Sequence, residues 1–401
     1  MKKKKSILIC SVGDLPDKKH GASTIVFYEY INFLLNKNIK VFYLSIQQNK
    51  ILKKNSYFVN QFKNKENLIL RQVHQNKIYN YNIKNFLYKK IDTMSLNKEL
   101  RLEILDFNPK KIIAFDIAAA SYIKKLRLNK KMYVWLGDLN FSTTWYHYYY
   151  DLKLNLFKIL YLPFILVMVL KWKFFYKRTL NRCKIVNASN INVSQLNNIK
   201  IKSIYLPYPW SVSYKKNKIK KYQIPSFLFY GNLKGLGSKS ALDYLLNKLH
   251  PSFVKNWGPN NFKIYICGNF QLDKTTFEKI KKINEVTFLG YLKNINTIAS
   301  KVHACLFPID VPVGNRSRIV TAMASGWPII AHKNVNKGNP SLKNGYNCLL
   351  CENLEDFKKN CDLIYNKKKI SSKLTLNAKK TYKQSFDKSS ALNKFLKFID
   401  E

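Results

Sequence analysis

The chain has 401 residues, 46% of them hydrophobic, so it is large enough for two or three folded domains and is not globally disordered. Lys and Arg number 70 against 23 Asp and Glu, which gives a formal net charge of +47. Such a charge favours anionic partners, although the abundance of Lys, Asn, Ile, Tyr and Phe is also what AT-rich coding produces. The sequence has no zinc-finger spacing, RNA-recognition signature or basic leucine zipper, so no specific nucleic acid is expected.

The first elements predict a parallel α/β domain. A buried strand at 6–12 is followed by a glycine-containing loop at 13–21, a helix at 22–36 and a strand at 39–46. Because parallel strands need a crossover, this order indicates a strand–helix–strand unit. Residues 48–105 predict mixed strand and helix. Further buried strands are expected at 111–117, 131–136, 185–188 and 204–206, and a helix at 118–128.

A run of twelve apolar residues, 159–170, is followed by lysines and aromatic residues as far as Arg178. At a rise of about 1.5 Å per residue, the run is too short to cross a hydrocarbon core of about 30 Å. One interpretation is a buried core helix. The other is an interfacial helix, with rings at headgroup depth and ammonium groups on anionic lipid. The net charge favours the second, so we expect segment 154–178 to dock on a membrane.

A second α/β domain is predicted after a charged linker at 215–222. Its strands are expected at 227–230, 262–267, 286–289, 303–309, 329–332 and 348–350, with intervening helices at 240–249, 275–283 and 295–301. The predicted fold class is therefore α/β, with two Rossmann-like doubly wound domains facing a central cleft. We assign 1–214 to the N-terminal domain and 215–385 to the C-terminal domain. A last helix, 386–401, is expected to pack back on the N-terminal domain.

The stretch from Gly314 to His332 is the most informative part of the chain. A loop with Gly314, Asn315, Arg316 and Arg318 follows a predicted strand and precedes a short apolar helix. Helix N-terminal N–H groups and guanidinium groups both attract phosphate. The sequence therefore predicts a phosphate site at this loop.

The seven cysteines are scattered, and most lie in apolar strand-like runs. Cys348 and Cys351 have the spacing of a redox or zinc pair, but no second pair or nearby His completes such a site. We interpret them as core residues in a reducing cytosol.

Five short motifs of the second half carry a family resemblance. They are Phe-Tyr-Gly-Asn-Leu at 229–233, Tyr-Ile-Cys-Gly at 265–268, Val-Thr-Phe-Leu-Gly-Tyr-Leu at 286–292, the 314–328 segment, and Asn-Gly-Tyr-Asn-Cys-Leu-Leu at 344–350. In this order and spacing the chain resembles glycosyltransferases of the GT-B fold, in particular the group-1 (family 4) type. The match covers most of the second domain and, more loosely, the first.

The chain departs from the family at one pair of positions. The family usually carries two glutamates there, the second of which grips the nucleotide ribose, whereas this sequence has Val313 and Thr321. The departure indicates a divergent branch. Arg316 and Arg318 are the expected replacements for binding strength, and Arg318 matches the family's basic position.

The resemblance implies transfer of a sugar from a nucleotide sugar, with retention of the anomeric configuration. The chain has no Asp-x-Asp metal motif, so no metal and no cofactor are expected; cationic groups would stabilise the diphosphate leaving group. For each charged residue a solvated surface position is the alternative. The expected donor-binding residues are Arg316, Arg318, Asn315, Gly314, Lys234, Lys239, Gly231, Tyr291 and Thr321.

The first domain offers candidates for the acceptor side. Asp116 and Asp138 follow predicted strands, where a catalytic or acceptor-binding carboxylate belongs, although Asp138 also suits a helix cap. We favour Asp138. Gly21 lets the backbone of the first loop approach a ligand, and its neighbour His20 is placed at the cleft edge.

The acceptor expected from the apolar segment and the basic surface is a glycan or lipid-linked saccharide. This predicts an enzyme of bacterial cell-envelope polysaccharide or lipopolysaccharide synthesis, cytoplasmic and peripheral on the inner face of the membrane. Two alternatives stay open: a nucleotide-sugar epimerase of the same fold, and a non-catalytic basic scaffold that binds membrane or nucleic acid.

Overall fold

The computed structural model describes residues 5–13, 15–18, 21–48, 58–79, 91–211, 214, 221–269, 272 and 274–401. It divides into two compact units: unit 1 comprises Met1–Pro209 with Ala391–Glu401, and unit 2 comprises Trp210–Ser390. Unit 1 therefore ends shortly before the predicted linker, of which residues 215–220 lie outside the described residues. The chain returns to unit 1 for its last residues.

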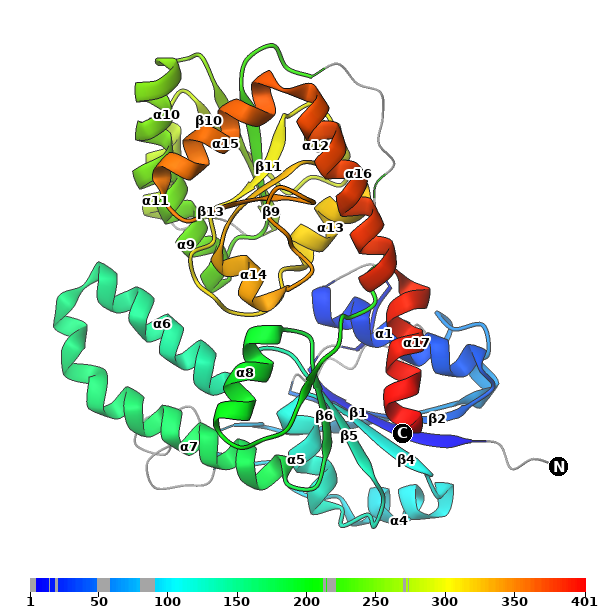
Figure 1. Ribbon diagram of the computed structural model, residues 1–401. Coiled ribbons are helices and arrows are strands. Elements are labelled where there is room, and N and C mark those ends of the chain that lie inside the picture. Colours follow the sequence, from blue (N-terminus) through cyan, green and yellow to red (C-terminus); the bar gives the residue numbers. More distant parts are fainter. Residues whose placement is uncertain are drawn as a thin grey trace. The chain divides into compact units, whose positions relative to one another are not determined.

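Unit 1 contains a seven-stranded parallel sheet with the order β3-β2-β1-β4-β5-β6-β7 (Figure 1). The order reverses between β1 and β4, so the carboxyl ends of these two strands form the topological switch point of the unit. The strands are β1 (Ser6–Val12), β2 (Lys40–Gln47), β3 (Leu68–His74), β4 (Lys111–Phe115), β5 (Met132–Leu136), β6 (Lys184–Asn187) and β7 (Ile204–Tyr205).

Successive side chains of each strand point to opposite faces of this sheet, and both faces are covered by packed helices. On one face Phe115 of β4 stacks on Phe27 of α1, with ring centroids 4.2 Å apart. Phe395 of α17 packs on Tyr30 of α1 on that same side, at 4.3 Å. On the other face Ala114 joins a core with Tyr122 and Trp172. The helices of unit 1 are α1 (Ala22–Asn36), α4 (Lys98–Phe107), α5 (Ile117–Lys125), α6 (Asn140–Leu154), α7 (Leu162–Leu180), α8 (Asn190–Asn198) and most of α17 (Lys388–Asp400); short 3₁₀ helices are η1 (Lys65–Asn67) and η2 (Leu156–Tyr161).

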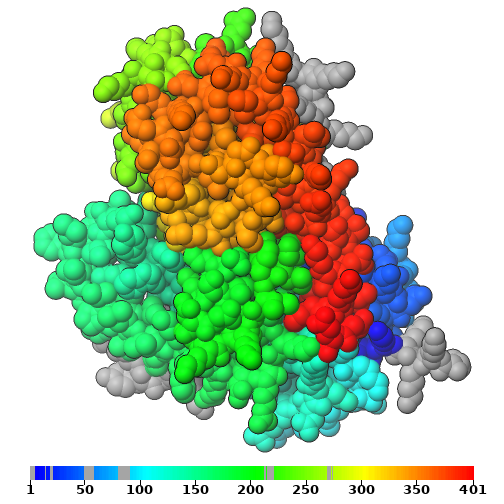
Figure 2. Space-filling model, in the orientation of Figure 1, coloured from blue at the N-terminus to red at the C-terminus, as the bar shows by residue number. Residues whose placement is uncertain are grey.

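Helices α6 and α7 form an antiparallel hairpin, which is the blue-green lobe of unit 1 in Figures 1 and 2. The second half of α7 is anchored, because Val169, Trp172 and Tyr176 belong to the unit 1 core. The tip is exposed; its apolar side chains are Leu154, Leu156, Phe157, Ile159, Leu160, Tyr161, Phe164, Leu166, Val167 and Leu170, which we call the apolar tip. Leu156–Leu180 is the one helical stretch among the described residues long and apolar enough to cross a membrane, by length and composition alone.

Unit 2 contains a six-stranded parallel sheet with the order β10-β9-β8-β11-β12-β13. Here the reversal lies between β8 and β11. The strands are β8 (Ser226–Asn232), β9 (Lys263–Asn269), β10 (Val286–Gly290), β11 (Ala304–Phe307), β12 (Ile329–His332) and β13 (Leu349–Cys351). Every strand predicted from the sequence in either unit is present, with bounds that shift by no more than two residues.

The helices of unit 2 cover both faces of this sheet (Figure 1). The helix predicted at 240–249 is longer in the structure. Its second half is a π-helical turn, Leu245–Leu249, which continues from α9. The helices are α9 (Leu236–Tyr244), α10 (His250–Trp257), α11 (Lys274–Lys281), α12 (Asn296–Ala299), α13 (Ser317–Ser325), α14 (Asn334–Gly338), α15 (Leu354–Asn366) and α16 (Lys368–Ser385).

Candidate functional site

The switch point of unit 2 brings two helix N-termini to one edge of the sheet. Helix α9 follows β8 and has Gly235 at its N-cap, and α13 follows β11 and has Arg316 at its N-cap. Neither N-cap residue makes a side-chain capping hydrogen bond. The first N–H groups of both helices carry partial positive charge, so this edge attracts anions before any side chain is considered.

Arg318, in the first turn of α13, lies over the loop that follows β8. Its guanidinium carbon lies 5.3 Å from the ring centroid of Phe229, in cation–π contact. Its Nη2 donates to Ser238 Oγ at 2.7 Å and to the Asn232 carbonyl at 3.4 Å. Tyr230 donates from its hydroxyl to the Arg318 carbonyl at 2.6 Å, which ties α13 to β8. The guanidinium is therefore held in one place from both sides.

Gly231 makes this arrangement possible. A Cβ at position 231 would lie 2.6 Å from the Arg318 guanidinium carbon, and the residue also has φ 137°. Both the space and the backbone conformation exclude a side chain at this position. Gly268 on the adjacent strand lets the backbone of β8 approach closely, because an added Cβ at position 268 would lie 2.2 Å from the Gly231 carbonyl. At two glycine positions of the family motifs, neighbouring atoms thus leave no space for a side chain.

Arg318 has no ion-pair partner among the residues that the structure describes. Burial, reinforced by the nearby charge of Arg316, lowers the pKa of Arg318 to about 10, so the guanidinium is still a cation at neutral pH. Its Nη1 is buried and has no hydrogen-bond partner in the described part of the chain. A buried cation that leaves one donor unused is costly unless a ligand supplies an acceptor. The geometry predicts an anionic ligand there.

Arg316 supplies a second guanidinium beside the first. A Cβ on Gly237 would lie 2.8 Å from its Nη2, so the absence of a side chain in the first turn of α9 lets Arg316 approach. That Nη2 also donates to the Val311 carbonyl at 3.4 Å. Gly314, with φ 70°, turns the loop that carries Asn315 and both arginines. The structure thus brings together Gly231, Gly314, Asn315, Arg316 and Arg318.

The other predicted donor-binding residues lie at greater distance or in a different environment. Lys234 and Lys239 are exposed residues of the β8–α9 loop and of α9. Tyr291 is 64% exposed just after β10, at the same sheet edge and two strands from β8, or about 10 Å at the usual strand spacing. Thr321 is buried, and its hydroxyl accepts a hydrogen bond from the indole of Trp210 at 2.8 Å, which secures the start of unit 2.

Sequence reasoning did not find Phe229, Ser238 and Asn232, which fix Arg318. Phe229 and Asn232 lie in a recognised motif, but the motif does not show that their partner is an arginine far along the chain. Ser238 follows Gly235 and Gly237 in the first turn of α9. A small hydroxyl residue in the first turn of a helix after a glycine turn is the one signal that indicates it.

The carboxyl edge of the unit 1 sheet carries the two aspartates, at the ends of the neighbouring strands β4 and β5. Asp116 follows β4 and caps α5, where its carboxylate accepts from the Ile117 N–H at 2.7 Å. Its φ of 82° is strained for a residue with a side chain. Burial, and to a smaller extent the charge of Asp138, raise the pKa of Asp116. Strain and a perturbed carboxyl at one position are typical of functional sites.

Asp138 is exposed and follows β5. Helix α6 has Leu139 at its N-cap, so the helix-cap interpretation of Asp138 is wrong. The preceding residue is fixed, because the amides of Asn187 and Asn192 both donate to the Gly137 carbonyl, at 2.9 and 3.0 Å. Gly21 precedes α1 with φ 77°. His20 lies outside the described residues.

Comparison with known structures identifies the fold. A glycosyltransferase from Rickettsia africae is 14% identical with a TM-score of 0.68, and the match covers 99% of this chain and 98% of that one. Anabaena Alr3699/HepE, solved with UDP, is 12% identical with a TM-score of 0.63 over 98% and 99% of the two chains. The lipopolysaccharide outer core galactosyltransferase WaaB is 13% identical with a TM-score of 0.63 over 98% and 99%. The two doubly wound units therefore have the GT-B glycosyltransferase fold, as predicted.

The family follows from unit 2. Residues 224–367 match the family model described as glycosyl transferases group 1, a stretch that includes β8, α9, α13 and both arginines. The match covers about a third of the chain and lies within unit 2, so the predicted resemblance to group 1 glycosyltransferases is confirmed for this unit. No curated protein matches the chain.

Proposed function

We propose that this glycosyltransferase moves a sugar from a nucleotide-sugar donor to a glycan or lipid-linked acceptor. The observation that carries the proposal is Arg318, a cation held over Gly231 with one buried donor unused. A diphosphate has the charge and the multiple oxygens that such a group requires. The complex of the Anabaena relative with UDP makes UDP-sugars the first donors to test.

In this proposal the diphosphate lies on the Arg316 and Arg318 guanidinium groups and the N-terminus of α13. As the bond from the anomeric carbon to the diphosphate oxygen breaks, the leaving oxygen gains negative charge. Fixed cations and helix N–H groups stabilise that charge without reorganising, and no metal is required in this role. The nucleoside reaches along the sheet edge toward Tyr291, which is exposed for stacking on a base.

The acceptor is assigned to unit 1. The exposed carboxylate of Asp138 orients the acceptor hydroxyl by accepting its hydrogen bond. The acceptor oxygen forms the new bond to the anomeric carbon on the face from which the diphosphate leaves, and the leaving diphosphate oxygen takes the proton. Asp116 is half-buried and positions this loop through the backbone, since its N–H donates to the Trp135 carbonyl at 2.8 Å. Retention of configuration, as the family resemblance implies, is part of the proposal.

The setting we propose is the cytoplasmic face of a membrane, in cell-envelope polysaccharide or lipopolysaccharide synthesis. The exposed apolar tip and the net charge of +47 support it. Because the second half of α7 packs into the core of unit 1, we infer that this helix lies on the membrane rather than across it. WaaB, which acts on the lipopolysaccharide outer core, suggests the class of acceptor.

The test is a thermal-shift screen over nucleoside diphosphates, followed by turnover assays of the best donor with and without lipid-linked glycans. The proposal expects stabilisation by mass action and release of nucleoside diphosphate that depends on the acceptor. Turnover that needs no acceptor would favour the epimerase. No shift with any nucleoside diphosphate would favour the non-catalytic scaffold.

A further inference from the structure

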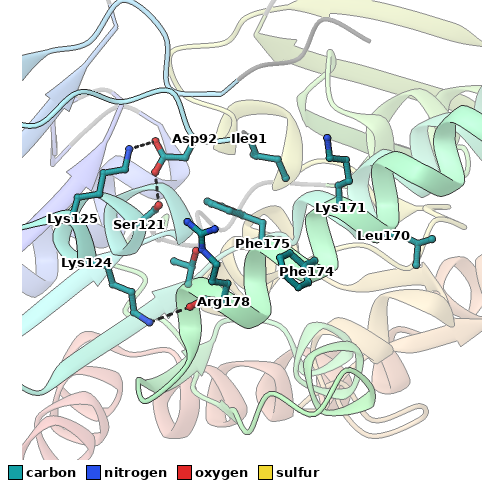
Figure 3. Close-up of a pocket in the computed structure, with 11 residues that line it drawn as sticks. Ile91, Asp92, Ser121, Lys124, Lys125, Leu170, Lys171, Phe174, Phe175 and Arg178 are labelled. Carbon is teal, nitrogen blue, oxygen red and sulfur yellow. Dashed lines mark hydrogen bonds and ion pairs between the residues drawn. The ribbon is translucent and has the colours of Figure 1, made fainter. Parts of the chain in front are cut away.

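Unit 1 holds a cavity of about 770 Å³ between α5, α7 and the segment around Asp92 (Figure 3). Leu170, Phe174 and Phe175 of α7 form one wall, and Ser121, Lys124 and Lys125 of α5 form another. The guanidinium of Arg178 lies between them (Figure 3). An apolar wall facing a cationic wall is the chemistry of an amphiphile site.

Asp92 is the one carboxylate among the described residues that line the cavity, and its charge is neutralised. Asp92 is paired with Lys125 at 2.9 Å and also accepts from the Ser121 hydroxyl. The ammonium of Lys124 is held by the Arg178 and Asn181 carbonyls, at 3.2 and 2.9 Å. These contacts fix the α5 wall and leave a positive excess in the cavity.

Arg178 and Lys171 are the cations of the α7 side of the cavity. They are seven residues apart on α7, so they share one face of the helix, about 10 Å apart along its axis, with Phe174 and Phe175 between them. The described part of the chain gives the Arg178 guanidinium no hydrogen bond or ion pair. When an anionic group of a ligand binds Arg178, an apolar chain attached to that group therefore lies along Phe174 and Phe175.

The cavity is continuous with the apolar tip. Leu170 lines the cavity and is 62% exposed as a member of the tip, and Phe174 beside it is 67% exposed. A ligand that enters from this side comes from whatever covers the tip. An exposed apolar surface of ten side chains on a strongly basic chain is complementary to an anionic lipid leaflet.

We propose that this cavity binds one anionic glycerophospholipid, with the phosphate at Arg178 and Lys171 and an acyl chain along Leu170, Phe174 and Phe175. The site is separate from the donor and acceptor residues, and it stands or falls independently of the proposed sugar transfer. The bound lipid would fix the orientation of unit 1 on the membrane. It provides a second point of attachment besides the apolar tip.

The test measures binding of a soluble short-chain phosphatidylglycerol to the full chain by native mass spectrometry and titration calorimetry. Short-chain phosphatidylcholine tests the need for negative charge, and glycerol phosphate tests the need for the acyl chains. We expect one phosphatidylglycerol per chain and weaker binding of both comparison ligands. Equal binding of phosphatidylcholine, or of glycerol phosphate, would overturn the lipid assignment.

Matched variants locate the site. Arg178→Glu should weaken phosphatidylglycerol binding by about tenfold, the loss of one charge-assisted contact, whereas Lys177→Glu makes the same charge change on α7 outside the cavity. Phe174→Ser should weaken binding, whereas the similarly exposed Leu102→Ser should not. Equal losses in Arg178→Glu and Lys177→Glu would show a diffuse charge effect and refute the cavity. Because the altered side chains are exposed, all four variants should fold, and thermal unfolding checks this.

Discussion

The guanidinium of Arg318 occupies the space that a side chain at Gly231 would need, 2.6 Å from the position of its Cβ. The two residues come from different elements of the switch point, Gly231 from the end of β8 and Arg318 from the first turn of α13. Their contact explains why the arginine has one defined position, on Phe229 and Ser238, and why a ligand anion would meet it there.

Gly231→Ala should displace the Arg318 guanidinium and weaken nucleotide binding by tenfold or more, about 1.4 kcal/mol. The physical reason is the clash together with the strain of a Cβ at φ 137°. Titration with UDP measures the effect. Gly345→Ala is the matched control, because Gly345 has φ 71° but open space around its Cβ. Equal loss in both variants would mean that backbone strain, and not the arginine, is responsible.

Asp116→Asn should lower turnover by less than the roughly hundredfold loss typical of a general acid–base group, because Asp116 positions the loop and Asp138 meets the acceptor. The fold should become more stable at neutral pH. A carboxyl whose folded pKa is raised binds more protons in the folded state, so stability falls as pH rises through the unfolded pKa, and the amide removes this loss. Denaturant unfolding at pH 7 and initial rates measure the two effects. A destabilised variant would contradict the raised pKa of Asp116.

Asp138→Asn should lower the pKa of Asp116, because the negative charge of Asp138 contributes to raising it. The pKa of Asp116 is measured by carboxyl NMR titration in the variant and in the wild-type chain. An unchanged pKa of Asp116 would show that the two carboxylates do not interact. Asp116 and Asp138 would then not belong to one site.

Phe157→Ser and Val169→Ser separate the membrane and core functions of the helical hairpin. Phe157 is 83% exposed, so its change should reduce flotation with anionic vesicles and leave stability unaltered. Val169 is buried in the unit 1 core, so its change should destabilise the fold by about 2–3 kcal/mol. Unaltered flotation of Phe157→Ser would contradict docking by the apolar tip.

His303 predicts an acid-sensitive fold for unit 2. Its Nδ1 accepts from the Ser226 N–H at 3.2 Å, and burial, with smaller contributions from Lys221 and Lys368, lowers the pKa of His303 to about 4. A lowered pKa gives stability that is full above the unfolded pKa of 6.5 and is lost as pH falls toward 4. For a half-exposed ring the loss is about 1–2 kcal/mol. Denaturant unfolding of His303→Gln should show a smaller fall over this range; an identical fall would exclude His303 as its source.

The fold could be predicted from the sequence because its signals are local. Ser6–Val12 and Ala22–Asn36 show complete strand and helix patterns, and the structure places β1 and α1 at those bounds. The order of the motifs then indicated a resemblance to group 1 glycosyltransferases, whose family model matches residues 224–367. The π-helical turn at Leu245–Leu249 could not be predicted, because an extra residue per turn leaves no composition signal.

The site could be predicted only in part. Arg318 was found from its motif, but its partner Ser238 lies 80 residues away and is known only from the sheet order. The strained φ of Asp116 likewise depends on how β4 meets α5. The apolar run 159–170 contains both exposed Leu160 and buried Val169, because the hairpin is anchored at one end only. The hydrophobic periodicity of this run did not reveal at which residue the helix enters the core.

The most direct test of the account is the affinity of Arg318→Ala for UDP, measured by titration calorimetry beside Lys282→Ala, an exposed lysine of the same unit. We predict that the arginine variant stays folded and binds at least tenfold more weakly, while the lysine variant binds like the wild-type chain. A folded Arg318→Ala protein with unchanged affinity would show that this guanidinium does not hold the diphosphate, and the account would fail.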